Sequence, residues 1–288
     1  MSRLGQFRSF NRKQIFFIFV LPMSLMAPAA NVWCQEVNSD VTEISQRDPI
    51  NIDVSTSYTA GNFSESVASK TVEKTISVQW SIYDTDFQLS TSTLNRTAPA
   101  GTLRTRVNKR VRIVPKLVSS SGSGDVLISA NREIIADAAT AIAMNFVMSA
   151  KIAAADSTKG LGTGKNDYSL GVTGSYPFEK ALLSGGTKYT VLGSPGVIKI
   201  NGITENIQLK NVWSGYVSLS TEFSSKLTTA VTFTVEQPSV NGTSYFQSTE
   251  ISSSYRINEL GGVRIYASKG ANQSSPDWSA GIGLFSSF

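Results

Sequence analysis

The last eleven residues place the strongest constraint on how this chain can fold. Apolar and small side chains alternate from Trp278 to the terminal Phe288, with Ala280, Ile282 and Leu284 on the apolar side. Side chains alternate between the two faces of a β-strand, so this segment predicts a strand with one apolar face and one small, polar face. Such an edge strand would promote aggregation of a soluble protein. We therefore expect it to close a barrel whose outer surface faces lipid.

The first 34 residues have the features of a secretory signal peptide. Four basic residues and no acidic residue precede a short apolar run over residues 15–21, and small residues follow at 27–30. A basic start, a short apolar core and small residues are typical of a cleaved export signal. A membrane-spanning helix would need about 20 apolar residues, and Pro22 interrupts this run.

Cys34 is the only cysteine, and it leaves a lipid-anchored protein as an alternative. The preceding residue, Trp33, argues against lipidation because a small residue is usual there. Cleavage is otherwise expected after Ala29 or Ala30, or after Cys34. The folded body then contains no disulfide. The expected organisation is a signal peptide over residues 1–34, a periplasmic N-terminal segment over 35–49 and an outer-membrane barrel over 50–288.

Composition excludes several classes of function. The chain has 26 basic and 21 acidic residues, and removing residues 1–34 leaves 22 basic residues against 21 acidic ones. This near-neutral balance predicts no nucleic-acid partner. The chain has no histidine, so it lacks the usual base of serine hydrolases and the commonest metal ligand. We expect no enzyme activity, cofactor or metal, although a carboxylate pair drawn from Asp167, Glu236 and Glu250 leaves glycoside hydrolysis open.

Alternation with a period of two recurs along the rest of the chain. Most of these segments have about ten residues, the length that a tilted strand needs to cross a bilayer. Strands of soluble proteins are usually shorter, about five or six residues. We predict an all-β, transmembrane antiparallel β-barrel of about 12 strands with periplasmic N- and C-termini. The strands are expected near residues 50–58, 72–83, 87–95, 126–135, 140–152, 167–176, 187–195, 212–223, 227–236, 245–257, 261–269 and 278–288.

The gaps between the predicted strands alternate between short and long, as in barrels with short periplasmic turns and longer external loops. Residues 177–186 predict a looser turn. Aromatic residues near the strand ends predict girdles at the two membrane interfaces. The alternative is that these aromatics form the core of a soluble sandwich. They are Trp80, Tyr168, Tyr176, Trp213, Phe223, Tyr245, Tyr255 and Trp278.

Residues 96–125 form the longest predicted connection, and this segment is strongly basic. No acidic residue occurs between Arg96 and Lys116. The segment could be an external loop that binds the phosphates of lipopolysaccharide, or a loop folded into the lumen that favours anions. It could also be a solvated loop or an extra hairpin, so that ten or fourteen strands remain possible. Its central basic residues are Arg104, Arg106, Lys109, Arg110 and Arg112.

Alternation places several charged residues on the inward face of the predicted barrel. In the lumen, such charges would select solutes by narrowing the pore and by the electric field that they create. Alternatively, they would pair across the lumen and fill a narrow barrel. A 12-stranded barrel is wider than the eight-stranded kind that side chains alone can fill. The lumen-facing candidates are Lys151, Asp167, Lys226, Glu236, Glu250, Arg256 and Arg264.

From Gly122 onward the sequence resembles the outer-membrane channel proteins associated with the meta-pathway of phenol degradation. The resemblance rests on Gly-Ser-Gly-Asp at 122–125, on Met-Ser-Ala-Lys-Ile at 148–152 with the Gly-rich loop up to Tyr168, and on residues 267–278. The family usually has Pro-Thr-Gly after its lysine, and an aromatic residue where Ser286 stands here. The resemblance implies a barrel that passes small molecules, hydrophobic or aromatic ones included.

We therefore expect an outer-membrane channel for passive uptake of small molecules in a Gram-negative bacterium. The main alternative is a non-conducting structural or surface-interaction barrel whose external loops bind lipopolysaccharide or a partner. A soluble secreted β-sandwich is a weaker third hypothesis. The expected partners are outer-membrane lipid and lipopolysaccharide, a small-molecule solute, and the barrel-assembly machinery, which would recognise the C-terminal strand ending in Phe288.

Overall fold

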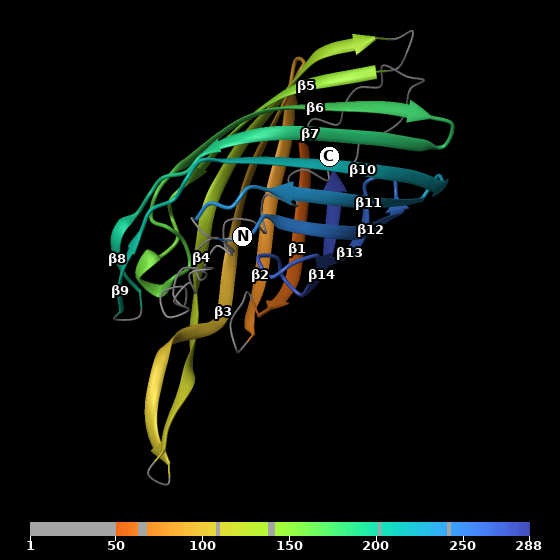
Figure 1. Cartoon of the computed structure of the whole chain (residues 1–288). Coiled ribbons are helices and arrows are strands. Elements are labelled where there is room, and N and C mark those ends of the chain that lie inside the picture. Colours follow the sequence, from red (N-terminus) through yellow and green to blue (C-terminus); the bar gives the residue numbers. More distant parts are fainter. Residues whose placement is uncertain (1–49, 63–67, 108–109, 138–141, 201–202, 241–242) are drawn as a thin grey trace, which may run out of the picture.

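Twelve antiparallel strands form a closed barrel in the computed structural model of the chain (Figure 1). The class and the expected number of strands are confirmed, and β14 closes the barrel against β1, with Trp278 opposite Ala60 and Ser287 opposite Asn51. The barrel strands are β1 (Ile50–Gly61), β2 (Ser69–Ile82), β3 (Thr85–Val107), β4 (Arg110–Asp137), β5 (Ile142–Ile152), β6 (Asp167–Phe178), β7 (Ala181–Val191), β10 (Val212–Ser224), β11 (Leu227–Glu236), β12 (Phe246–Asn258), β13 (Gly261–Gly270) and β14 (Trp278–Ser287).

The structure describes residues 50–62, 68–107, 110–137, 142–200, 203–240 and 243–288. The expected signal peptide and periplasmic segment, including Cys34, lie outside these residues and stay predictions. No helix within the described residues is long and apolar enough to span a membrane.

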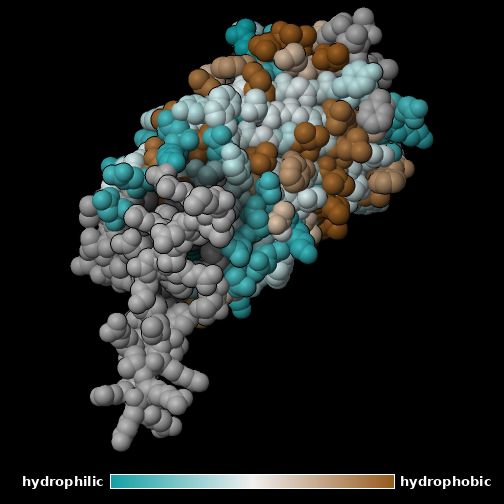
Figure 2. Space-filling model, in the orientation of Figure 1, coloured by the Kyte–Doolittle hydropathy of each residue, from teal (hydrophilic) through white to brown (hydrophobic). Residues whose placement is uncertain are grey.

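Apolar side chains cover the outside of the barrel, and small polar side chains face inward. On β10, for example, Val217 is 57% exposed while the next residue, Ser218, is 8% exposed. On β14, Ile282 and Leu284 are exposed on either side of the buried Gly283. Figure 2 shows the apolar residues as brown patches on the barrel wall. This exterior suits hydrocarbon, and the closed barrel contradicts the hypothesis of a soluble sandwich.

One end of the barrel carries the tight turns, and we name it the turn end. The described two-residue turns lie at 83–84, 179–180, 225–226 and 259–260. The start of β1 and the end of β14 also meet at this end. There the amide of Phe288 donates a hydrogen bond of 2.9 Å to the carbonyl of Ile50. The looser turn predicted over 177–186 is wrong. In the sequence Gly185 and Gly186 suggest a turn. In the structure both lie inside β7, where they pair with residues of β6 and β10.

The longer connections lie at the opposite end, which we name the loop end. One of them contains a small separate sheet of β8 (Gly196–Ile200) and β9 (Ile203–Ile207), where the sequence predicted only a loop. Exposed aromatic residues lie outside the barrel near both ends. At the loop end, Tyr189 and Trp213 have ring centroids 5.1 Å apart, and Tyr58 and Trp278 lie 5.0 Å apart.

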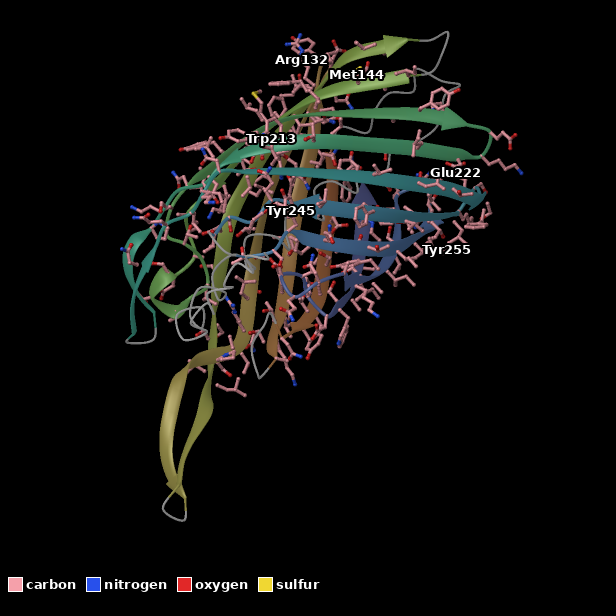
Figure 3. The ribbon with its side chains drawn as sticks, in the orientation of Figure 1. Arg132, Met144, Trp213, Glu222, Tyr245 and Tyr255 are labelled. Atoms are coloured by element: carbon pink, nitrogen blue, oxygen red, sulfur yellow. The ribbon has the colours of Figure 1, made fainter. Side chains whose placement is uncertain are left out.

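Two aromatic girdles follow from these positions. Trp213 and Tyr245 lie toward the loop end, whereas Tyr255 lies at the turn end (Figure 3). Phe223 is exposed one residue before the end of β10, so it also lies at the turn end. Ten residues of strand, at about 3.3 Å each and a tilt of about 40°, rise about 25 Å along the barrel axis. This span matches the apolar band of a membrane barrel. Seven of the eight predicted girdle residues, all but Trp80, are exposed on the outer surface, and their place at the membrane interfaces stays a prediction.

The basic segment 96–125 is part of a long hairpin. Strands β3 and β4 continue past the barrel as a two-stranded ribbon, with Thr97 opposite Ser119 and Val107 opposite Arg110. Figure 1 shows this ribbon projecting away from the loop end. The expectation of a lumen-folded loop is therefore wrong, and so is that of fourteen strands, because the ribbon only prolongs β3 and β4. Arg104 and Arg106 alternate with Leu103 and Val107 as in a strand, but the run of basic charge outweighed this pattern and predicted a connection there.

Candidate functional site

A buried ion cluster joins three neighbouring strands on the inside of the barrel. The Nζ atom of Lys151 on β5 lies 2.9 Å from Asp167 Oδ2 on β6 and 3.3 Å from Asp125 Oδ2 on β4. The three side chains are only 11%, 5% and 11% exposed, respectively. The structure thus brings together two of the predicted lumen residues and adds Asp125. Asp125 belongs to the Gly-Ser-Gly-Asp motif, which was the available signal for it.

The connection between β5 and β6 folds inward on the loop-end side of this cluster. We name this connection, residues 153–166, the inner loop. Near its start, the amides of Ala154 and Ala155 donate to Asp125 Oδ1 at 3.0 and 2.9 Å. The side chain of Leu161 is 1% exposed and forms a buried apolar cluster with Leu94 and Ala155. Leu94 alternates with exposed residues along β3, so it belongs to the inward face. The inner loop therefore lies against the inner wall.

Further contacts fix the inner loop to β3 and β4. Arg96 donates from Nη1 to the carbonyl of Gly160 at 3.1 Å. Gly122 lies opposite Leu94 in the β3–β4 register, and a Cβ at Gly122 would stand 2.8 Å from Leu161 Cδ1. A Cβ at Gly162 would stand 2.8 Å from the Cβ of Ala155. The glycines at 122 and 162 thus allow the loop to approach the wall closely. The 122–125 motif lies within β4, whereas the sequence predicted a strand that begins only at residue 126.

A short helical turn, η2 (Ser157–Lys159), shapes the middle of the inner loop. Asp156 caps it, accepting hydrogen bonds from the Thr158 hydroxyl at 2.6 Å and the Thr158 amide at 2.9 Å. The hydrogen bond from the Thr158 side chain is the main cause that lowers the pKa of Asp156 from its usual 3.8, and Lys159 contributes. The stabilisation by this cap is therefore complete above the usual pKa and is lost as pH falls through the lowered value.

A second pair of opposite charges lies on another part of the inner wall, where it spans three strands. Lys188 on β7 and Glu236 on β11 both lie opposite Ser214 on β10, and their charges attract each other. The sequence identified Glu236 but missed Lys188, whose partner comes from a distant part of the chain. Glu250 on β12 lies opposite Thr232, a buried residue of the inward face.

A third group of charges lies nearer the turn end. Arg264 Nη1 on β13 is 3.4 Å from Asp53 Oδ2 on β1. Its guanidinium carbon lies 5.8 Å from the centre of the Phe285 ring on β14, which is a cation–π distance. The inward position predicted for Arg264 agrees with this environment, and Asp53 is a partner that the sequence did not reveal.

Lys226 and Arg256 lie at the rim of the barrel. Lys226 is exposed in the turn between β10 and β11, and Arg256 is exposed near the end of β12. The amide of Arg256 donates to the carbonyl of Lys226 at 2.8 Å, so both lie at the turn end. The assignment of Lys226 to the lumen wall is wrong, because this residue lies in a turn and not on a strand. Arg256 lies on β12 at the rim of the barrel, and its inward position stays a prediction.

Between the charged groups the inner wall carries mainly short hydroxyl side chains. Paired hydroxyls join adjacent strands, at 2.8 Å between Ser218 and Thr232 and 2.9 Å between Ser169 and Thr190. Tyr266 crosses the neighbouring strand over Gly281, where any Cβ would collide with its ring. Within the described part of the chain, no group of three or more acidic residues is placed to hold a metal ion. The site can therefore bind or select solutes through hydrogen bonds and charge.

Comparison with known proteins supports the fold. No family model and no curated protein matches the sequence. Among solved structures, the NanC porin has a TM-score of 0.53 at 13% identity, covering 82% of this chain and 99% of the porin. The translocator domain of the autotransporter NalP from Neisseria meningitidis has a TM-score of 0.53 at 12% identity, covering 85% and 90%.

The transport unit of the autotransporter AIDA-I from Escherichia coli is also similar, with a TM-score of 0.55 at 10% identity, covering 92% of this chain and 96% of that unit. At such low identity the likeness concerns the barrel fold. A closed 12-stranded barrel of this type, with an apolar exterior, places the chain in the bacterial outer membrane.

Proposed function

We propose that this protein is a passive channel for small solutes in the outer membrane. The observation that carries the proposal is the inner wall, where short hydroxyl side chains and paired charges line a barrel of twelve strands. Eight strands leave an interior that side chains fill, and twelve give a wider one. Several inward serines are nevertheless buried, among them Ser90, Ser92 and Ser129, which favours a narrow lumen and small solutes.

The orientation of the barrel is part of this proposal. Short turns face the periplasm in outer-membrane barrels, so the turn end, with Ile50 and Phe288, would be periplasmic. The first 34 residues would act as the export signal, and the barrel-assembly machinery would recognise the last strand. The resemblance to channels of the phenol meta-pathway suggests that hydrophobic or aromatic molecules are among the solutes. The tyrosine and phenylalanine rings on the inner wall are compatible with such solutes.

Channel activity is expected from the purified barrel in planar lipid bilayers, as stepwise ion conductance. A tryptophan in place of Ser57, which faces inward on β1, should lower this conductance because it adds bulk to the lumen. The matched variant Thr56→Trp adds the same bulk to the exposed outer surface and should leave conductance unchanged. A folded barrel that gives no conductance, or equal conductance in both variants, would contradict the channel function.

Surface binding is a second candidate function, supported by the ribbon of β3 and β4 that projects from the loop end. This ribbon carries Arg104, Arg106, Arg110 and Arg112 and no acidic residue; Lys109 lies outside the described residues. Arginine pairs well with phosphate, so the ribbon would bind lipopolysaccharide. Binding need not exclude conduction.

Replacing these four arginines with glutamine should weaken binding of the detergent-purified barrel to lipopolysaccharide micelles several-fold. The control is the same replacement of four basic residues near the turn end: Arg132, Lys180, Lys226 and Arg256. Equal loss of binding in both proteins would indicate general charge attraction instead of recognition by the ribbon.

A further inference from the structure

We propose that the inner loop, residues 153–166, sets the upper size of the solutes that pass the lumen, and that Leu161 and Lys151 hold it in place. The proposal rests on the proposed channel function. It assigns the size limit to a segment that the sequence suggested only as a connection between two strands. The basic segment 96–125, the candidate constriction in the sequence, projects outward instead.

The position of the inner loop makes it the constriction. Leu161 packs on Leu94 and beside Gly122, which lie opposite each other on the inward faces of β3 and β4. A connecting loop at this end could extend into solvent, as the β3–β4 ribbon does. The inner loop turns back onto the wall, so its backbone occupies part of the lumen cross-section near the loop end.

Leu94, an apolar residue on a mainly polar inner wall, holds the centre of the loop through its contact with Leu161. The inward residues that precede Leu94 along β3 are Ser90 and Ser92, so Leu94 is the first apolar residue after two inward hydroxyls. Leu161 lies on this residue with 1% of its surface exposed, and Gly122 leaves the room for it. Removing such an apolar side chain from water stabilises the folded-in position. Arg96 adds a hydrogen bond to the carbonyl of Gly160 in the same turn of the loop.

The ion cluster fixes the two ends of the loop. Asp125 accepts the amides of Ala154 and Ala155 at the start, and Lys151 Nζ donates to Thr163 Oγ1 at 3.1 Å near the end. Asp167 follows the loop directly and also accepts the amide of Gly193 at 2.8 Å. With both ends and the centre held, the inner loop is a fixed constriction that narrows the channel permanently.

The test is the size dependence of solute flux through liposomes that contain the protein. Swelling rates are measured with arabinose, glucose, sucrose and raffinose for the wild type, Leu161→Ser and Lys151→Met. Both variants remove an anchor of the inner loop, so the sucrose rate relative to the arabinose rate should rise several-fold. The control is Val240→Ser, which removes a buried aliphatic side chain from a different loop-end connection and should keep the wild-type ratio.

The outcomes separate this proposal from the channel function. Heat-modifiable gel mobility first establishes that each variant is a folded barrel. An unchanged sucrose-to-arabinose ratio in both loop variants, with the wild type conducting, overturns the assignment of the constriction and leaves the channel intact. No swelling with any sugar in the wild type and all variants overturns the channel function, and the size limit with it.

Discussion

Arginine in place of Leu219 should lower the free energy of unfolding of the barrel in phospholipid vesicles by about 2–4 kcal/mol. Leu219 lies midway along β10 with its side chain exposed on the outer surface. In the membrane this surface meets hydrocarbon, where a guanidinium loses its hydration. The loss is largest at the bilayer midplane and smaller near the girdles. Urea titration of the vesicle-bound protein, followed by tryptophan fluorescence, measures the change.

The adjacent residue supplies the control. Ser220 faces inward on the same strand, so Ser220→Arg places the same charge among polar groups and should cost less than about 1 kcal/mol. Equal losses for the two variants would show that the two faces of β10 do not differ in polarity. That result would contradict a lipid-facing exterior and the placement in a membrane.

Much of the barrel could be predicted from the sequence because membrane barrels impose a local rule on every strand. The alternation of Trp278, Ile282 and Leu284 with small residues depends only on which face meets lipid, so it is visible without knowledge of the partner strands. Where the rule does not apply, the prediction was wrong. In the projecting part of β3 and β4 a run of basic residues obscured the strands, and Gly185 and Gly186 within β7 carry no side chain that could alternate.

The site was less predictable because its contacts join distant parts of the chain. Lys151 and Asp167 were identified from alternation, but their partner Asp125 lies two strands before Asp167 and sits beside a bulge where alternation shifts. Lys188 and Asp53 likewise acquire their roles from partners on other strands. A single sequence reveals which face a residue occupies, but the ion pairs depend on register, which the structure supplies.

The inner loop illustrates the same limit. Its glycines indicated a turn, and nothing local in the sequence distinguishes a loop that extends into water from one that folds inward. The difference comes from Leu94 and Gly122, which form a seat for Leu161 only once β3 and β4 are paired. The run of basic residues at 104–112 suggested a constriction through its composition. The inner loop, which folds inward instead, is held by Leu161 and the buried Lys151.

Methionine in place of Lys151 should destabilise the folded-in position of the inner loop by about 3–5 kcal/mol. The change leaves the buried carboxylates of Asp125 and Asp167 without their shared ammonium group. The amides of Ala154 and Ala155 report the loss directly, because they donate to Asp125. Their protection from hydrogen exchange should fall about 100-fold or more, since every 1.4 kcal/mol corresponds to a factor of about ten.

The control for this prediction lies in the same loop. Lys159 pairs with Asp156 at 3.7 Å, but the two side chains are 54% and 41% exposed. Water screens such a pair, so Lys159→Met should change protection by no more than about fivefold. Adding Asp167→Asn to Lys151→Met should restore part of the protection, because a neutral amide no longer repels Asp125. If both lysine variants exchange equally fast, the buried cluster does not hold the loop.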